Sequence, residues 1–245
     1  MVAVPGRSSE KSRRSAEFPS AASLGAAIED YLKAIYQLSL ASERVAPSTV
    51  ATKLGISQAA VTKMIKRLRT RRLVRYGRPQ GVVLTDSGRR VALEMIRHHR
   101  LLEAYLYKAL GYSWDEVDRE AEILEHAISE EFEDRIDQLL GHPTHDPHGS
   151  PIPTKDGRVE DVDFPALGDL AVGQRGTIRR VDGRDPDKLR YLGELGLYPD
   201  TPIQLLEREP FGGPLQLLVK GKKRAIGPEL ARHVFVAVQE GGMLR

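Results

Sequence analysis

The stretch SWDEVDREAEILEHAISEEFEDRIDQLLG, residues 113–141, determines how the rest of this sequence is interpreted. Its first four residues, SWDE, have the pattern of a capping box and predict a helix that begins at Trp114. Gly141 predicts where that helix ends. Apolar residues recur between these limits at steps of three and four, which gives the helix one apolar stripe.

A group of charged side chains lies beside this stripe. Because residues three and four apart share one side of a helix, Glu122, Glu125 and His126 converge on one point. Two carboxylates and an imidazole make a donor set for a divalent metal ion. A solvated acidic face gives the same pattern and, for this stretch alone, is the commoner explanation. The choice between the two depends on the rest of the chain.

Composition sets outer limits on the kind of protein. A length of 245 residues suits two domains or three small ones. The absence of cysteine excludes disulfides and thiolate metal sites. No apolar run reaches the length of a membrane span, and residues 1–23 lack the apolar centre of a secretory signal, so we expect a disordered tail there. Cytoplasmic residence is the resulting expectation.

Charge is divided sharply along the sequence. Residues 1–100 hold 19 Lys and Arg against 7 Asp and Glu, whereas residues 101–150 hold 3 against 13. Residues 151–245 are nearly balanced, with 15 against 14. A basic first part suggests a polyanionic partner, and an acidic middle part suggests bound cations. Together they predict a protein with two kinds of site.

The basic part has the pattern of a winged helix-turn-helix. After a helix predicted over residues 24–40, a short helix at 47–54, the breaker Gly55 and a second helix capped by Ser57 give the helix pair. Strand-like runs on both sides of a Gly-rich turn form the wing. In such a fold the second helix faces base edges in the major groove, and basic residues reach phosphates. The candidate DNA contacts are Ser57, Gln58, Ala59, Ala60, Thr62, Lys63, Arg67, Arg75 and Arg78.

The long helix predicted over residues 87–110 carries two polar residues on its apolar stripe. His99 and Glu103 lie one turn apart there, and polar groups on an inward face need partners. A single buried histidine is more often a core residue than a ligand. The acidic helix that follows nevertheless favours a second cation site at this pair.

The last part of the chain changes character twice. Residues 141–167 form a linker with five prolines and three histidines, His142, His145 and His148. We expect a Pro-rich loop to hold these histidines too loosely to organise a metal site. Residues 168–240 then alternate or run apolar as strands around one short helix, which predicts a small β-barrel.

Five motifs carry a resemblance to a known family. They are Ile28-Glu-Asp-Tyr-Leu32, Ala59-Ala-Val-Thr-Lys-Met64, His99-Arg-Leu-Leu-Glu103, Glu122-Ile-Leu-Glu-His126 and Pro147-His-Gly-Ser-Pro-Ile-Pro153. In this order they resemble the diphtheria-toxin-repressor family of metal-dependent repressors, in its manganese-sensing branch. The resemblance covers about residues 24–240 and implies a multidomain, mainly α fold. The implied domains are a winged helix-turn-helix at 24–93, a helical dimerisation and metal-binding domain at 94–140, the linker at 141–167 and an SH3-like barrel at 168–240.

The resemblance also implies two metal sites. Carried over residue by residue, the primary site falls on Asp30, Glu122, Glu125 and His126. The ancillary site falls on His99, Glu103 and Asp118, with Asp185 of the barrel as a weaker match. Iron-sensing members have Met and Cys at the positions of Asp30 and Glu122, and carboxylates there favour Mn²⁺, with Fe²⁺ as the alternative. A relative with two adjacent metal ions has Glu at the position of Lys33, which argues against such a pair here.

The function implied by the resemblance is that of a homodimeric repressor of metal-uptake genes. An ion bridging the first helix to the dimerisation helix would set the recognition helices about one DNA turn apart, roughly 34 Å, and favour a palindromic operator. Two other function classes remain open. One is a winged-helix regulator that responds to a non-metal ligand. The other is a di-metal carboxylate enzyme, which needs Glu and His three residues apart, whereas Glu122 and His126 are four apart.

Overall fold

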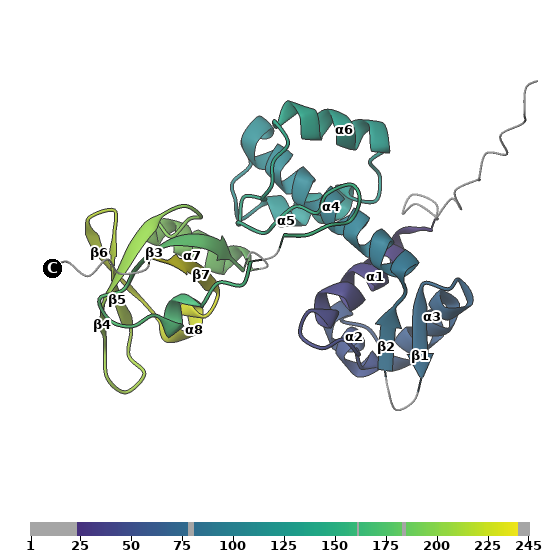
Figure 1. Ribbon diagram of the computed structural model, residues 1–245, viewed down its shortest axis with the longest axis horizontal. Coiled ribbons are helices and arrows are strands. Elements are labelled where there is room, and N and C mark those ends of the chain that lie inside the picture. The colour runs from purple at the N-terminus through teal and green to yellow at the C-terminus, as the bar shows by residue number, and fades with distance from the viewer. Residues whose placement is uncertain (1–23, 78–80, 161, 183–184, 240–245) are drawn as a thin grey trace, which may run out of the picture.

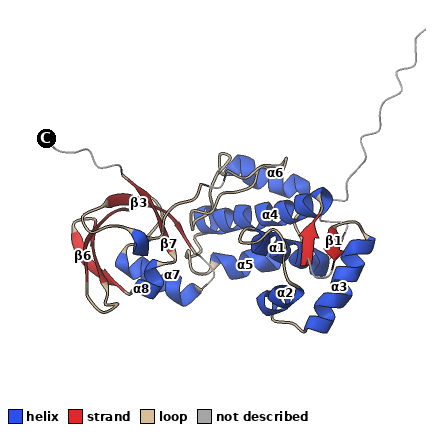
Figure 2. Ribbon diagram, turned by 60° about the horizontal axis from the view of Figure 1, so that its bottom comes forward, coloured by secondary structure: helices blue, strands red, loops and turns tan. Residues whose placement is uncertain are grey.

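The protein consists of three parts that follow one another along the chain (Figure 1). The computed structural model describes residues 24–77, 81–160, 162–182 and 185–239. The expected tail and Arg78 lie outside these residues. Helices make up most of the first two parts, and the larger sheet belongs to the third (Figure 2), so the predicted multidomain, mainly α architecture is confirmed. None of the described helices is both long enough and apolar enough to cross a bilayer.

The first part is a winged helix-turn-helix. Its elements are α1 (Ala26–Ser39), α2 (Pro47–Leu54), α3 (Gln58–Thr70), β1 (Val74–Gly77) and β2 (Gly81–Leu84). Gly55 makes the tight turn after α2 with a left-handed φ of 66°, a conformation that side chains with a Cβ disfavour. The Ser57 hydroxyl then caps α3 by accepting a hydrogen bond from the Ala60 amide at 3.2 Å. Both features agree with the sequence prediction.

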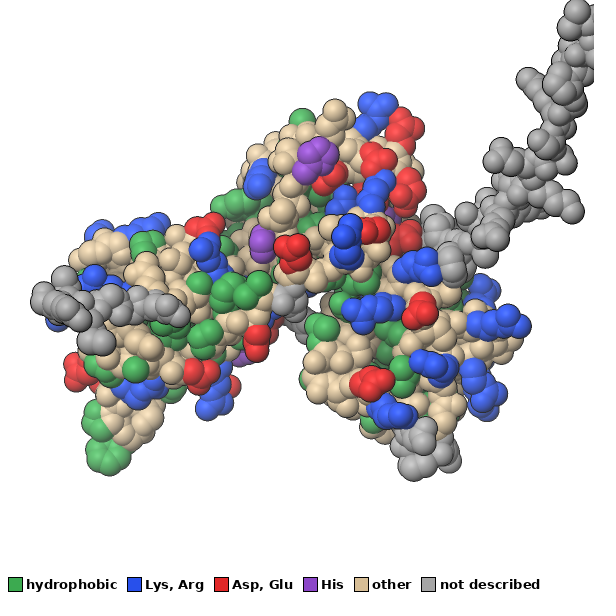
Figure 3. All heavy atoms as spheres, viewed as in Figure 1, with side chains coloured by type: hydrophobic (Ala, Val, Ile, Leu, Met, Phe, Trp, Pro, Cys, Tyr) green, Lys and Arg blue, Asp and Glu red, His purple; other side chains and the backbone are tan. Residues whose placement is uncertain are grey.

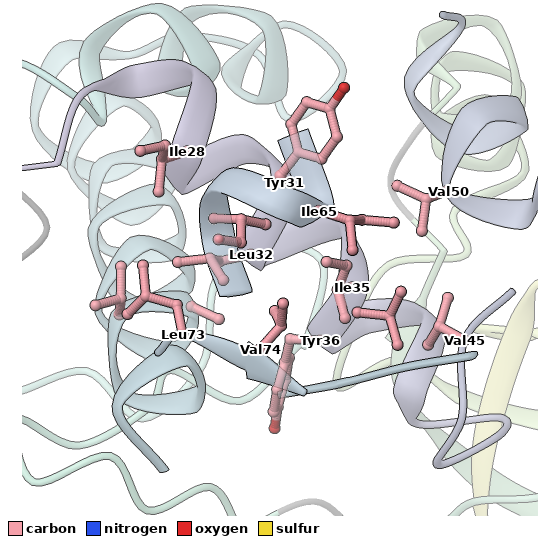
Figure 4. Close-up of a cluster of buried hydrophobic side chains, with 14 of the residues drawn as sticks. Ile28, Tyr31, Leu32, Ile35, Tyr36, Val45, Val50, Ile65, Leu73 and Val74 are labelled. Atoms are coloured by element: carbon pink, nitrogen blue, oxygen red, sulfur yellow. The ribbon is translucent and has the colours of Figure 1, made fainter. Parts of the chain in front are cut away.

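An apolar cluster joins α1 to the recognition helix α3 (Figure 4). Leu32 and Ile35 of α1 and Ile65 of α3 are at most 1% exposed. Burying a side chain of this kind contributes about 1.5–3 kcal/mol. Because a close-packed core transmits displacement, a change in the position of α1 is passed on to α3.

The second part contains α4 (Asp86–Leu110), α5 (Val117–Leu124) and α6 (Glu130–Leu139). The prediction of a single helix from Trp114 to Gly141 is therefore wrong, because the observed helix starts at Val117 and a break separates α5 from α6. Trp114 is 5% exposed and packs into the core of the third part, which removes it from the helix. The Ser129 hydroxyl accepts a hydrogen bond from the Phe132 amide and starts α6 anew.

The third part is a five-stranded sheet, in the order β6-β5-β4-β3-β7, that curls into a small barrel (Figure 2). The strands are β3 (Arg175–Val181), β4 (Pro202–Arg208), β5 (Leu215–Val219), β6 (Lys222–Ile226) and β7 (Val234–Val238). Three helical elements flank them: η2 (Leu167–Asp169), α7 (Pro186–Leu195) and α8 (Pro228–Ala231). The edge strand β6 was not predicted, because it begins with two exposed lysines and its apolar and polar residues do not alternate.

The segment between α6 and the barrel is more ordered than its prolines suggest. His148 is 2% exposed, and its carbonyl accepts a hydrogen bond from the Val181 amide of β3 at 2.8 Å. Its ring lies 5.8 Å from the Trp114 ring. The expectation that this loop holds its histidines loosely is wrong for His148, whereas His142 and His145 are exposed.

Gly149 packs directly against the backbone of β3 in the barrel. Its φ is 86°, and a Cβ there would lie 1.9 Å from the Arg179 carbonyl oxygen. We predict that Gly149→Ala destabilises the protein by about 3 kcal/mol or more, because strain and overlap add. Gly157→Ala is the matched control, since its φ is 75° but the nearest atom is the Leu93 side chain at 3.6 Å. It should cost only about 1 kcal/mol. Denaturant unfolding of both variants measures the difference, and equal losses would contradict the role of this contact.

Candidate metal centre

Asp30 of α1 and the residues that end α5 meet in one cluster. The His126 Nε2 atom lies 2.9 Å from Asp30 Oδ1 and 3.6 Å from Glu125 Oε1. One ligand atom from each residue lies within 4.8 Å of the others, a spacing that a single ion can span. The structure thus brings together three of the four predicted primary ligands, from two separate segments.

Asp30 shows that this cluster suits a cation. Its Oδ1 atom is buried and has no hydrogen-bond partner among the described residues, although the His126 Nε2 atom lies 2.9 Å away. Burial raises the pKa of Asp30, and the nearby carboxylates of Glu122 and Glu125 raise it further, against the opposing charges of His126 and Lys33. An anionic oxygen without a donor is costly in a protein interior, and a divalent ion would satisfy it.

Glu29 orients the imidazole of this cluster. Its carboxylate is 3% exposed and lies 2.6 Å from the His126 Nδ1 atom. Because a carboxylate only accepts hydrogen bonds, Nδ1 carries the proton, and in the neutral ring Nε2 keeps its lone pair toward Asp30. Metal-binding histidines use this arrangement. Sequence reasoning missed Glu29, although a carboxylate between Ile28 and Leu32 on the apolar stripe was a usable signal.

Glu122, the fourth predicted ligand, points toward Lys33 instead. The Lys33 Nζ atom donates to Glu122 Oε2 at 2.7 Å and to both oxygens of Glu125 at 2.7 and 2.8 Å. It also lies 3.4 Å from His99 Nδ1. His99, Glu122 and Glu125 themselves form a group with metal-ligand spacing, and the Lys33 ammonium lies among them.

The predicted ancillary residues lie next to this group, with one exception. His99 Nε2 is 3.5 Å from Glu103 Oε1 and 3.4 Å from Asp118 Oδ1. Burial opposes the charged form, but the charge of Glu103 and hydrogen bonds to Asp118 and Glu103 raise the pKa of His99 well above its usual value. Asp185 is not part of the cluster. Its carboxylate caps α7 by accepting from two backbone amides at 3.1 and 3.3 Å.

A further buried cluster shares Glu103. His148 Nδ1 lies 3.5 Å from Glu103 Oε1, and Asp146 completes a group of three buried residues. The His148 Nε2 atom is 2.7 Å from the Trp114 carbonyl oxygen and donates to it. Despite burial, the hydrogen bond to Glu103 raises the pKa of His148 to about 9, while burial and Glu103 raise the pKa of Asp146 to about 6. Sequence reasoning missed this cluster because the linker prolines suggested disorder.

Both clusters open onto one cavity. Asp30, Lys33, His99, Glu103 and His148 all contribute to its wall. Residues of β3 and β7 line the same cavity, so the barrel covers one side of it. An ion entering this cavity would reach the primary cluster and the Glu103 group from the same side.

The candidate DNA contacts lie on the surface of the first part. Ser57, Gln58, Ala59, Ala60, Lys63, Arg67 and Arg75 are exposed, and Thr62 is half-buried. Lys and Arg side chains gather over this part (Figure 3). Positive charge beside an exposed recognition helix is the pattern expected for contact with a DNA backbone.

Three family models match consecutive parts of the chain. The model described as "Iron dependent repressor, N-terminal DNA binding domain" matches residues 23–82. The model described as "Iron dependent repressor, metal binding and dimerisation domain" matches residues 85–154. The FeoA domain model matches residues 166–238. These limits follow the three parts of the structure.

Individual proteins are similar over most of the chain. The iron-dependent repressor IdeR of Mycobacterium tuberculosis (strain ATCC 25618 / H37Rv) is 31% identical over 220 residues, 84% of this chain and 94% of that protein. The HTH-type transcriptional regulator MntR of Geobacillus kaustophilus (strain HTA426) is 33% identical over 46% of this chain and 79% of its own length. A solved manganese-dependent transcriptional repressor in complex with manganese has a TM-score of 0.79 and 39% identity, covering 86% of this chain and 100% of that one.

The contact of Glu29 with His126 leads to a prediction on metal affinity. We expect Glu29→Gln to weaken Mn²⁺ binding about 10–100-fold, since the loss of a partner that orients a ligand typically has this effect. The exposed Glu43→Gln is the matched control and should leave affinity unchanged. Competition with a fluorescent chelator measures both. Equal affinities for the two variants would show that Glu29 does not orient His126.

Proposed function

Because this chain belongs to the iron-dependent repressor family, which includes the diphtheria toxin repressor, we propose that it is a repressor activated by Mn²⁺. The family assignment confirms the resemblance seen in the sequence and makes the chain a metal-dependent, DNA-binding transcriptional repressor that regulates metal homeostasis, not an enzyme. A family dimerisation domain supports a homodimer. The metal, its ligands and the operator are the subject of the proposal.

One observation carries the choice of site. The buried Oδ1 atom of Asp30, which has no hydrogen-bond partner in the described part of the chain, faces His126 and Glu125 from a different segment. We assign the activating ion to Asp30, Glu125 and His126, with Glu122 as a further ligand from α5. Oxygen and imidazole donors without any sulfur suit Mn²⁺ and Fe²⁺ and disfavour thiophilic metals. The similarity to a manganese-bound repressor supports Mn²⁺ as the first choice, with Fe²⁺ as the alternative.

A bound ion would supply the positive charge that compensates the carboxylates of α1 and α5. Asp30 would then hold α1 to α5 through the ion, and Leu32 and Ile35 of α1 belong to the same buried cluster as Ile65 of α3. In a homodimer this would fix the two recognition helices about one DNA turn apart, roughly 34 Å, for a palindromic operator. Ser57 to Lys63 would then face base edges, and Arg67 and Arg75 the phosphates.

We propose an ancillary site centred on Glu103. His99 and Asp118 lie on one side of its carboxylate, and Asp146 and His148 on the other. An ion held here would connect α4 to the segment that carries the barrel. Asp185 is left out of this proposal because its carboxylate already caps α7.

The proposal predicts metal-dependent DNA binding. Using an operator selected from random duplexes in the presence of Mn²⁺, we expect affinity at physiological salt to fall about 5–150-fold when the metal is removed. Asp30→Ala and His126→Ala should cause the same loss with Mn²⁺ present. Glu229→Ala, at an 83% exposed side chain of the barrel, is the control and should bind normally. If the two ligand variants retain full affinity, a non-metal effector becomes the better explanation.

The same ligands predict how Mn²⁺ affinity depends on pH. Burial raises the pKa of Asp30, so this carboxyl takes up a proton at higher pH than an ordinary aspartate does. Protons therefore compete with the ion increasingly as pH falls. We expect affinity to drop by up to roughly tenfold per pH unit for each proton displaced. Titrations at pH 7.5, 6.5 and 5.5 measure this, and a constant affinity would contradict the assigned ligands.

A further inference from the structure

We propose that Arg72, in the turn between α3 and β1, binds a phosphate group of the DNA duplex beside the recognition helix. This contact adds to the DNA contacts described above, and the backbone conformation of Arg72 makes it costly for the fold. The inference rests on the DNA-binding domain of this family and not on the choice of metal.

The backbone of Arg72 has a conformation that favours glycine. Its φ is 59°, in the left-handed region where a Cβ crowds the backbone. Arg72 directly follows the C-cap of α3, and the Leu73 amide donates to the Leu68 carbonyl at 3.0 Å. A hydrogen bond of this span closes a type of helix end in which glycine is the usual left-handed residue. An arginine here therefore strains the turn.

Packing on both sides holds the turn in this conformation. Leu68 and Leu73 belong to the buried core of the first part. The Thr85 hydroxyl donates to the Arg72 carbonyl at 2.7 Å, and the Thr85 amide donates to the Leu73 carbonyl at 3.0 Å. A strained conformation persists only where its surroundings determine it in this way. None of these contacts involves the arginine side chain, so glycine would satisfy them equally well.

The charge of Arg72 is not compensated within the described chain. Its side chain is exposed, and no acidic residue that the structure describes pairs with it. Exposed arginines of the second and third parts, by contrast, include several with carboxylate partners at 2.7–2.9 Å: Arg135 with Glu131, Arg179 with Asp200, and Arg190 with Asp187. The guanidinium of Arg72 therefore remains open to an anion outside the chain.

The sequence around Arg72 indicates that this anion is a polyanion. Residues 44–85 contain ten Lys and Arg and no Asp or Glu. Arg69 and Arg71 are exposed beside Arg72 at the end of α3. The dipole of α3 also favours cations at this end, which is the alternative explanation for them. That explanation requires Arg72 to stabilise the fold, whereas a strained turn requires the opposite.

The length of α3 brings its last turn to the DNA backbone. The helix has 13 residues, which is roughly 20 Å at the usual rise of an α-helix. The major groove is about 12 Å wide. A helix whose first turns face the base edges therefore extends past one wall of the groove, where the phosphates lie. Arg72 follows directly on this end.

The salt dependence of DNA binding tests the phosphate contact. On an operator selected with the wild-type protein and saturating Mn²⁺, the slope of log affinity against log salt should be less steep in Arg72→Gly by about 0.9 per chain. Taken from a reference of about 1 M salt, this slope corresponds to roughly 5-fold weaker binding per contact at physiological salt, or about 30-fold for a homodimer. Arg72→Lys keeps the charge and should retain most of the wild-type affinity.

Denaturant unfolding of the same variant tests the strain. We expect the unfolding midpoint of Arg72→Gly to lie above that of the wild type, because the relief of strain exceeds the entropy that glycine adds to the unfolded chain. Lys220→Gly is the matched control, since Lys220 is an exposed cation of the barrel with a left-handed φ of 48°. It should also unfold at a higher midpoint, and it should bind DNA like the wild type.

The two measurements separate the explanations. If Arg72→Gly keeps the affinity and the salt slope of the wild type, the phosphate contact does not exist. If Arg72→Gly unfolds at a lower midpoint than the wild type, Arg72 stabilises α3 and the turn is not strained. Neither result depends on which metal activates the protein, because all variants are compared at the same Mn²⁺ concentration.

Discussion

Carboxylates that meet at the junction of α1 and α5, with Glu125 fully buried, are the constraint on which the rest of this structure depends. Asp30, Glu122 and Glu125 come from segments almost a hundred residues apart, and the charges of Glu122 and Glu125 raise the pKa of Asp30 in addition to burial. Lys33 supplies a cation at this junction, and Asp30 Oδ1 has no hydrogen-bond donor within the residues that the structure describes. The position of α1, and through the shared apolar core that of α3, therefore depends on how this charge is compensated.

Glu103 is a second buried carboxylate, and it lies between the metal cluster and the segment that leads to the barrel. Its Oε1 atom lies 3.5 Å from both His99 Nε2 and His148 Nδ1, so one carboxylate serves two clusters. His148 in turn belongs to the segment that binds β3 through Val181 and contacts Trp114, whose ring lies in the barrel core. Charge at the centre of the protein and the placement of the barrel are thus joined by direct contacts.

The sequence predicted those features that depend on residues close together in the chain. The cap at Ser57 and the turn at Gly55 depend on residues within four positions of one another. Of the three side chains predicted to converge, Glu125 and His126 lie together with Asp30, whereas Glu122 points toward Lys33. The sequence could not predict features that depend on distant partners. Trp114 lies in the barrel core and not in the predicted helix. The His148 carbonyl accepts a hydrogen bond from β3, and Glu29 contacts His126 from a distant segment. Lys33 was noted as an unusual residue, but its contacts with Glu122 and Glu125 appear only in three dimensions.

A sensor can respond to a ligand only by the difference in affinity of that ligand for its two states. The hydrogen bonds from Lys33 to Glu122 and Glu125 already join α1 to α5, the two segments that an ion at Asp30 would connect. Binding of the ion then costs less free energy for ordering α1 against α5. This favours tighter metal binding but a smaller change in DNA affinity. The contacts of Lys33 therefore reduce the share of the attachment between α1 and α5 that depends on the cell's metal supply.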